Sequence, residues 1–424
     1  MEHPEGEADD GSLRVDFDRG YRLPKLHRWA GHMGNDGEIG RAMGTEASKT
    51  AGDDTQLVPS DADHLSGVSP VGTSVKQVGL KDIFEKAEMI CPTIAVCLPD
   101  IAEYIHDDPP IVKALKTGAY QARTAECRAI WIGKMPSGVT TVGYDFWMTY
   151  EDRVVIETIP HGLHGTDIVV PDISANLYEI GEECVPLCRF GHGTWGHWLG
   201  EILPMAALIE RAFPGRFHYA VSWEHGLYNT RVEESLAAYG ILENRIIKLS
   251  PDRSYRFSHA YRTTELWSSN SLHPMALDVM RGSIRIPTAI KSGDRVALQR
   301  SGSIGTGRTI GNINEIDRVL QERGFELVDI GSLTFMEQVG VFRSATNIFS
   351  VLGSALTGLI YASEGASVTI VRPHGWLDMF FYNLAQQRNA RWVEIAGPTQ
   401  GDNPFNSPFL VPVGVLKAIL NKSS

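Results

Sequence analysis

From residue 185 to residue 373 the sequence alternates short apolar runs with longer segments that carry apolar residues at helical spacing. A short apolar run between turn signals is typical of a buried strand, and the longer pattern is typical of a helix. Strands that follow one another through a helix pair in parallel with right-handed crossovers. The sequence therefore predicts an α/β fold. The first predicted strands are 185–190, 217–223 and 245–250, and the helices are 195–213, 231–241 and 273–284.

A break in this alternation at 285–294 predicts a boundary between two domains. The segment holds a proline, a glycine and several polar residues, which is typical of a linker. The alternation then resumes, and Asn312 and Thr334 each stand three residues before a glutamate, the pattern of a helix N-cap. The strands predicted in this half are 295–300, 325–330, 346–352 and 367–373, and the helices are 312–324, 334–345, 353–365 and part of 409–420.

The rest of the chain is less regular. Residues 1–75 are rich in Gly, Asp, Glu and Ser, so they bury too little apolar surface to offset the entropy of ordering. Residues 76–180 mix a predicted helix at 80–90 with strand-like pieces at 140–150 and 153–159. The predicted division is a disordered tail at 1–75, an N-terminal α/β domain at 76–287, a second domain at 288–396, and a C-terminal segment at 397–424 whose helix packs back across the domains.

The charge of the chain limits its partners. A formal net charge of -12 argues against general affinity for nucleic acid or anionic lipid, although Arg295, Arg300 and Arg308 can form a local basic cleft. The acidic start lacks the basic and apolar regions of a signal peptide, and no apolar run is long enough to span a membrane. We expect a cytoplasmic protein with no integral membrane segment and no nucleic-acid partner.

The five cysteines of the 424 residues are sparse and odd in number, which fits a reducing compartment better than a disulfide framework. Cys184 and Cys188 have a loose ligand-like spacing, but no second Cys or His pair completes a zinc pattern. We therefore expect no structural zinc.

The segment 189–204 crowds histidines, tryptophans and a glutamate into a predicted strand-to-helix turn, where open α/β sheets place ligands. His197 and Glu201 are four residues apart, so they share one helical face. Histidine ordinarily titrates near neutrality, and a carboxylate partner fixes its tautomer, so the pair is a candidate general base. The alternatives are a helix-surface pair without a catalytic task and a metal site completed by His161 or His164.

Two further segments have the residues of a diphosphate site. Arg300, Ser301 and Arg308 accompany several glycines between a predicted strand and the next helix. The arginines offer cationic forks, and the small residues let the backbone approach phosphate oxygens. The second segment is the turn 353–358 after an apolar strand, where free backbone N–H groups meet the positive end of a helix dipole. The alternatives are an exposed loop and a close packing of helix on sheet.

Three motifs, in this order, resemble glycosyltransferase family 61. They are the string GHWLGEILP at 196–204, the arginine-bearing run at 300–312, and the segment EQVGVFRSATNIFSVLGSALTGLIYA at 337–362. The likeness covers about residues 185–372. It implies a GT-B architecture, in which two Rossmann-like domains face a cleft, the second domain binds a nucleotide sugar, and the transfer inverts the anomeric carbon.

The resemblance and the residues together predict the roles in the site. His197, oriented by Glu201, deprotonates the acceptor hydroxyl, and Arg300 and Arg308 neutralise the leaving diphosphate. Gln338 matches a family position and has a supporting role. The other predicted donor contacts are Ser301, Asn312, Gly353, Ser354, Ala355 and Thr357.

No metal and no other cofactor is expected, because no Asp-x-Asp motif stands at a suitable strand end and arginines take the place of a cation. The predicted donor is a UDP-sugar, and the predicted acceptor is a glycan or a lipid-linked hydroxyl of polysaccharide biosynthesis.

Two alternatives of other classes follow from the same sequence. Where many family members have His and Asn, this chain has Leu352 and Gly358, which leaves open a catalytically degenerate glycan- or nucleotide-binding protein. A Rossmann-type oxidoreductase is disfavoured, because no GxGxxG motif at a strand-to-helix turn is followed by an acidic residue about 20 positions on.

Overall fold

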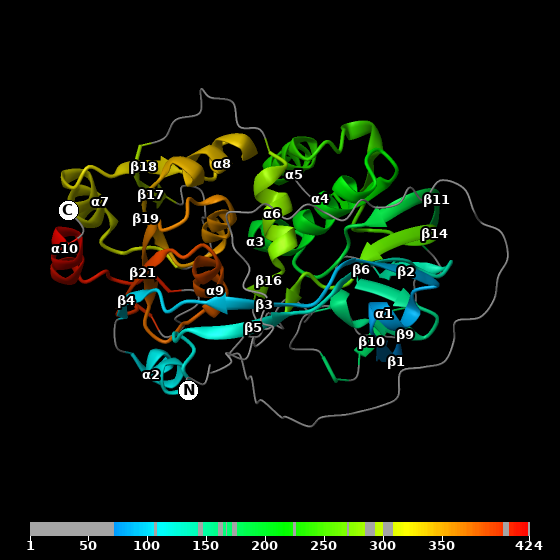
Figure 1. Ribbon diagram of the computed structural model, residues 1–424, viewed down its shortest axis with the longest axis horizontal. Helices are drawn as coiled ribbons and strands as arrows, with labels where there is room; N and C mark the ends of the chain where they lie inside the picture. Colours follow the sequence, from blue (N-terminus) through cyan, green and yellow to red (C-terminus); the bar gives the residue numbers. More distant parts are fainter. Residues whose placement is uncertain are drawn as a thin grey trace, which may run out of the picture. The chain divides into compact units, whose positions relative to one another are not determined.

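Two large β-sheets, of 11 and six strands, organise the protein (Figure 1). The computed structural model describes residues 72–105, 108–142, 147–159, 164–166, 168–171, 176–223, 226–268, 271–284, 293–299, 308–401 and 407–422. The disordered tail predicted at 1–75 lies outside the described residues except for its last few positions, where the first strand begins. Arg300, Ser301 and His161 also lie outside them. The described residues belong to one compact unit.

The first sheet has a parallel centre. Strands β14, β11, β12 and β13 lie side by side in that order and pair in parallel. The predicted strands at 217–223 and 245–250 are confirmed, whereas the one predicted at 185–190 begins earlier and ends at Pro186, and the sequence pattern does not predict β14. The bounds are Leu177–Pro186 (β11), His218–Ser222 (β12), Ile246–Leu249 (β13) and Ser254–Thr263 (β14).

Strands from the N-terminal part of the chain extend this sheet, mostly in antiparallel pairs. The hairpin β7–β8 confirms the strand-like piece predicted at 140–150, whereas the one predicted at 153–159 is a strand only in β9, since residues 156–158 form a 3₁₀ helix. The bounds are Gly72–Val78 (β1), Lys86–Cys91 (β2), Ile130–Lys134 (β6), Val139–Val142 (β7), Trp147–Tyr150 (β8), Arg153–Val155 (β9) and Ile168–Pro171 (β10).

The helix predicted at 80–90 is wrong beyond its first turn. Helix α1 (Leu80–Ile83) ends at Ile83, Phe84 already has an extended backbone, and the chain continues as β2, which pairs with β6. The Phe84 ring lies directly on Gly133 of β6, where a Cβ atom would approach a ring carbon to 2.2 Å. Packing against the sheet therefore outweighs the helical pattern of the sequence.

The second sheet is parallel throughout, in the order β18-β17-β19-β20-β21-β4. The four strands predicted in this half are confirmed. The sequence pattern does not predict β21, or β4, which comes from the N-terminal half and lies beside β21 (Figure 1). The bounds are Arg295–Gln299 (β17), Glu326–Asp329 (β18), Asn347–Val351 (β19), Ser367–Pro373 (β20), Arg391–Gly397 (β21) and Ala102–Ile105 (β4).

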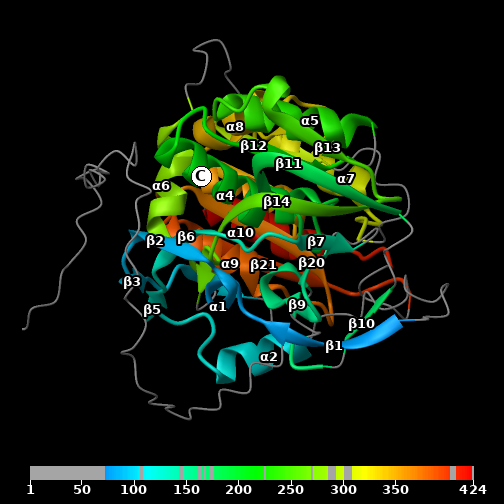
Figure 2. The same cartoon turned by 90° about the vertical axis from the view of Figure 1, so that its right-hand side faces the viewer.

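Strands β3 (Ile94–Leu98) and β5 (Arg123–Cys127) lie side by side as a separate antiparallel pair (Figure 1, Figure 2). Along the chain, β4 and α2 (Pro109–Lys116) come between these two strands. The short strands β15 (Trp267–Ser268) and β16 (Ser271–Leu272) form a separate pair.

Helices cover both sheets, so the predicted α/β class is confirmed. The long helix predicted at 195–213 is divided into α3, a π-helical stretch η5 (Trp198–Ile202) and α4. No helix of the described residues is long and apolar enough to cross a lipid bilayer. The bounds are Trp195–His197 (α3), Leu203–Ala212 (α4), Gly226–Ala238 (α5), Pro274–Gly282 (α6), Ile313–Glu322 (α7), Phe335–Ser344 (α8), Met379–Gln387 (α9) and Val413–Lys422 (α10).

The two predicted N-caps have different outcomes. Thr334 forms a complete capping box with Glu337 at the start of α8, so this cap is confirmed. Asn312 precedes α7 but gives it no side-chain cap, so this cap is wrong. Its amide instead pairs with the backbone of Val411.

A buried segment, η7 (Ser354–Tyr361), is the centre of the packing between the helices of the two halves. The sequence predicts an α-helix at 353–365, but η7 is a 3₁₀ helix. It contacts α3, η5 and α6 of the first half and α8 and α9 of the second. Gly358 has no space for a side chain, because a Cβ atom would lie 2.0 Å from a ring carbon of Phe342. The departure from the family pattern at Gly358 therefore has a packing reason.

The fully buried Arg372, in β20, joins distant parts of the chain. Its Nη1 lies 2.6 Å from Asp108 Oδ2 at the start of α2, and its Nε lies 2.5 Å from Glu394 Oε1 in β21. Tyr120 and Trp392 each donate a hydrogen bond of 3.0 Å to the other Glu394 oxygen. Burial alone would raise the pKa of Asp108, but the hydrogen bond and charge of Arg372 outweigh it and lower that pKa.

We predict that Asp108→Asn lowers the free energy of unfolding by about 2–3 kcal/mol at neutral pH, because one carboxylate of a buried ion group is lost. A carboxylate with a lowered folded-state pKa stabilises the protein above its unfolded-state pKa and stops doing so below its folded-state pKa. The difference between wild type and variant should therefore be constant above about pH 5 and shrink below about pH 4. Urea unfolding at several pH values measures it.

Glu103→Gln is the matched control. Glu103, in β4, also pairs with an arginine of the second sheet, Arg391 in β21, but both side chains are exposed. An exposed pair contributes less than about 1 kcal/mol. Equal losses in the two variants would contradict a special role for the buried group.

Candidate active site

The order of strands identifies where ligands bind in each sheet. In doubly wound sheets they bind at the carboxyl ends of the strands where the strand order reverses. In the second sheet this point lies between β17 and β19. The residues after β17 include Arg300 and Ser301, which lie outside the described part of the chain, and η7 follows β19. In the first sheet the corresponding point lies between β11 and β14.

Glu201, in the segment after β11, binds two other side chains of the site. Its Oε1 lies 3.1 Å from His197 Nδ1, as the spacing of four predicts, and its Oε2 lies 2.7 Å from Arg189 Nη1. The side chain of His197 is 41% exposed, whereas those of Glu201 and Arg189 are 13% exposed. With Nδ1–H donated to the carboxylate, Nε2 of the neutral imidazole is left as the acceptor of a proton. This is the geometry of a general base.

The backbone around His197 leaves space for the imidazole ring. Gly191 has a φ of +80°, which glycine adopts readily and other residues do not. A Cβ atom there would also lie 2.5 Å from His197 Cδ2. The π-helical stretch η5 follows directly, and such stretches are frequent at functional sites.

The helix turn that carries His197 lies against the predicted diphosphate turn. A Cβ atom on Gly196 would lie 3.3 Å from Ser354 Oγ and 3.4 Å from Thr357 Oγ1, so the helix turn that carries His197 packs directly on the start of η7. Thr357 is fully buried, and among the described residues its hydroxyl has no hydrogen-bond partner. Gly353 precedes η7, and Ala355 is half-buried in its first turn.

Gln338 connects the same two parts. Its Oε1 accepts a hydrogen bond of 3.0 Å from Trp195 Nε1, and its Nε2 donates to Leu333 O over 3.2 Å. This contact suits the supporting role that the sequence predicts for Gln338.

Arg308 lies at the other end of the site. Its guanidinium carbon lies 4.3 Å from the centre of the Trp376 ring, in the loop after β20. Stacking on the indole face holds the plane of the guanidinium in one orientation.

Asn312 lies apart from these groups. Its Nδ2 donates to Val411 O, and its Oδ1 accepts from Val411 N, both over 3.0 Å. The amide therefore braces the chain before α10, and its predicted donor contact gains no support from this position.

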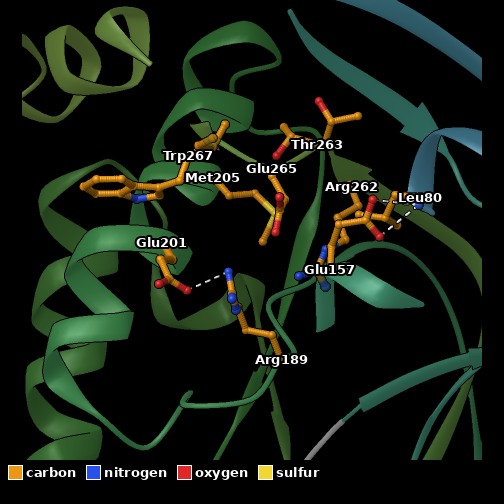
Figure 3. Close-up of a pocket in the computed structure, with 11 residues that line it drawn as sticks. Leu80, Glu157, Arg189, Glu201, Met205, Arg262, Thr263, Glu265 and Trp267 are labelled. Atoms are coloured by element: carbon orange, nitrogen blue, oxygen red, sulfur yellow. Dashed lines mark hydrogen bonds and ion pairs between the residues drawn. The ribbon is translucent and has the colours of Figure 1, made fainter. Parts of the chain in front are cut away.

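A pocket opens between the ends of β11 and β14 (Figure 3). Arg189 reaches Glu201 across it, and Glu157 accepts hydrogen bonds from Leu80 N on its far side (Figure 3). The space is about 500 Å³, open solvent included. Its polar lining consists of Glu157, Arg189, Glu201, Arg262, Thr263, Thr264 and Glu265, and its apolar lining of Leu80, Met205, Leu266 and Trp267.

Burial changes the acidity of two groups in this pocket. It raises the pKa of Glu157, and it lowers the pKa of Arg262 to about 10, with help from the nearby charge of Arg189. Sequence reasoning missed these residues. Glu201 is the lining residue that the sequence predicts, and Arg189 opens the segment at 189–204 that contains it.

Possible metal ligands are dispersed. Among the described residues no group of three His, Cys, Asp or Glu side chains can hold a metal ion. Cys184 and Cys188 are buried free thiols whose pKa values burial raises. His192 has its Nδ1 3.0 Å from Arg189 O.

The comparison with known families agrees with the resemblance seen in the sequence. Residues 195–369 match the family model of Glycosyltransferase 61. The match begins at α3 and ends within β20, so it contains His197, Glu201, Arg308 and the turn at Gly353. No curated protein matches the chain.

We predict that Gly191→Ala lowers the free energy of unfolding by about 2–3 kcal/mol, of which about 1 kcal/mol is backbone strain and the rest is the clash with His197. Adding His197→Ala should remove the part of the loss that is caused by the clash, and leave the backbone strain. Urea unfolding of the single and double variants measures the coupling.

Gly215→Ala is the control, because Gly215 has a φ of +73° and nothing lies near its Cβ position. It should lose only about 1 kcal/mol and show no coupling to His197. Equal behaviour of the two alanine variants would mean that Gly191 does not position the histidine.

Proposed function

Residues 195–369 form a glycosyltransferase family 61 domain, so the chain is a glycosyltransferase, and we propose that it is an inverting, metal-independent one that uses a nucleoside diphosphate sugar. The acceptor is a hydroxyl of a glycan or of a lipid-linked sugar. The proposal includes a GT-B arrangement, with the first sheet on the acceptor side and the second on the donor side.

The contact of Gly196 with Ser354 and Thr357 carries this proposal. It brings the His197 turn of the first half against the predicted diphosphate turn of the second. A base and a leaving-group site must lie within one substrate length of each other for direct displacement.

In the proposed reaction His197 Nε2 takes the proton of the acceptor hydroxyl. The acceptor oxygen then bonds to the anomeric carbon from the side opposite the diphosphate, and the bond from that carbon to the diphosphate oxygen breaks with its electron pair. The configuration at the anomeric carbon is thereby inverted. Glu201 stabilises the imidazolium, and Arg189 holds Glu201 in place.

On the donor side the leaving diphosphate bears the new negative charge. Arg308 and Arg300 supply cationic groups, and the backbone N–H groups around Gly353, Ser354 and Ala355 supply further donors. Metal independence is supported by these arginines and by the lack of an Asp-x-Asp motif at a suitable strand end.

The pocket beside Glu201 suits the acceptor. Carboxylates and guanidinium groups exchange hydrogen bonds with sugar hydroxyls, and an indole such as Trp267 packs against the apolar face of a sugar ring. His197 does not line this pocket, so a sugar bound there, on the side of Glu201 that faces Arg189, is a neighbour of the reacting sugar in the acceptor.

We predict that UDP or GDP raises the melting temperature of the wild type by a few degrees, also in EDTA, and that Arg308→Ala abolishes the shift. Arg253→Ala is the control, since Arg253 also stacks on an aromatic ring, that of Tyr178 at 4.5 Å. A shift that needs added manganese would overturn metal independence, and the absence of any shift would overturn the donor site.

We predict that His197→Ala lowers turnover about 100-fold or more and Glu201→Gln about tenfold, because the base is lost in one and only its charged partner in the other. Release of nucleotide from UDP-sugars, with water as acceptor, is the first assay. His259→Ala, an exposed histidine of β14, should retain activity. Retained activity in His197→Ala would assign the base elsewhere, and NMR of the product tests inversion.

A further inference from the structure

Asp378 stands at the start of α9 and is not among the residues that the sequence singles out. Its Oδ1 accepts a hydrogen bond of 2.9 Å from Phe380 N and so caps the helix. The cap explains why an aspartate is favourable here, but it uses only one carboxylate oxygen.

The loop that carries Asp378 is rigidly held. Arg372 Nη1 donates to Pro373 O and to Trp376 O, both over 3.1 Å. Gly375 N donates to Asp108 Oδ2 over 3.4 Å, so the same buried ion group fixes the loop twice. A carboxylate on such a loop has a defined position.

The two ends of this loop touch the two halves of the proposed reaction centre. At one end Trp376 stacks on Arg308. At the other, Phe380 packs on the helix of His197: a Cβ atom on Gly200 would lie 2.9 Å from Phe380 Cζ. The Phe380 ring also lies 4.6 Å from that of Trp267, which lines the pocket.

Asp378 interacts electrostatically with both functional groups. Burial raises its pKa, and the positive charges of Arg308 and of a protonated His197 oppose that rise. Among the residues that the structure describes, these two supply the charges that act on its carboxyl.

We propose that Asp378 is a positioning residue of the transfer reaction, a fixed carboxylate between His197 and Arg308 that acts on both. The inference rests on the proposed function and adds a charged group that the family match at 195–369 does not contain.

A carboxylate in this position has opposite effects on nucleotide binding, at Arg308, and on the transfer step, at His197. The carboxylate partly neutralises Arg308, so it weakens the binding of a nucleoside diphosphate and helps the product to leave. It also stabilises the positive charge that forms on His197 when the acceptor proton arrives, so it speeds the transfer. A residue that only supports the fold would weaken binding and turnover together.

The test compares the full-length wild type with Asp378→Asn and Asp378→Ser. Both replacements retain a side chain that caps a helix, so they remove the charge and keep the cap. We expect calorimetry with UDP and with GDP to show binding of one nucleotide that is about threefold to tenfold tighter in both variants. Turnover in nucleotide release from UDP-sugars and GDP-mannose should fall about tenfold or more, with a lower KM for the donor.

Asp100→Asn is the matched control, because Asp100 also accepts from a backbone N–H two residues on, that of Ala102 at 3.1 Å. Asp100→Asn should leave the affinity for the nucleotide and the turnover unchanged.

The binding results distinguish a failure of the proposed donor site from a failure of the role proposed for Asp378. If the wild type binds neither UDP nor GDP, the proposed donor site fails, and the role of Asp378 fails with it. If the wild type binds one of them, but both Asp378 variants bind it equally or more weakly, only the role of Asp378 is overturned.

Discussion

The ion group of Arg372 with Asp108 and Glu394 is the interaction on which the arrangement of the two halves depends. Removing three charges from water costs more than their attraction returns unless the geometry is good, so such a group adds little net stability. The ion group instead selects one arrangement of the segments that carry its charges. Because Asp108 comes from the N-terminal half and Glu394 from β21, the group holds α2 and β4 against the second sheet. It also fixes the loop that ends at Asp378.

Glycines provide the second constraint, because two helices approach closely only where a side chain is missing. Gly196 meets Ser354, and Gly200 meets Phe380, so the helix turns that carry His197 and Glu201 lie directly against the second half. Larger residues at these positions would separate the base from the leaving-group side by the width of a side chain. The string GHWLGEILP thus contains the base and also the contacts that place it.

The sequence predicts the α/β class and most strands, and its failures have identifiable physical causes. The first half of β11 is mostly exposed, and β14 mixes apolar residues with polar ones, several of them buried, so a search for continuous apolar runs misses both. No local pattern predicts β4, because its partner, β21, lies almost 300 residues further along the chain. Phe84 shows the reverse case, in which a helical pattern yields to contact with Gly133.

In the candidate site, too, the sequence predicts local pairs but not contacts between distant segments. The pair of His197 and Glu201 follows from helical spacing alone, so the sequence predicts it correctly. The positions of Arg189 and Trp376 depend on how loops from separate elements fold together, and no spacing encodes that. Asn312 shows the limit of motif matching, because a residue in a matching run directs its amide to the backbone of Val411.

The charges across the site alternate in sign: Arg308, Asp378, His197 when protonated, Glu201 and Arg189. The proposed transfer creates two charges, a positive one on His197 and a negative one on the diphosphate. The first appears between two carboxylates and the second beside Arg308, so each forms next to groups of opposite sign that are already in place. A site arranged in this way needs little reorganisation at the moment of reaction, and reorganisation is a large part of the barrier in water. The buried ion group and the glycine contacts therefore serve the reaction by keeping this order of charges fixed.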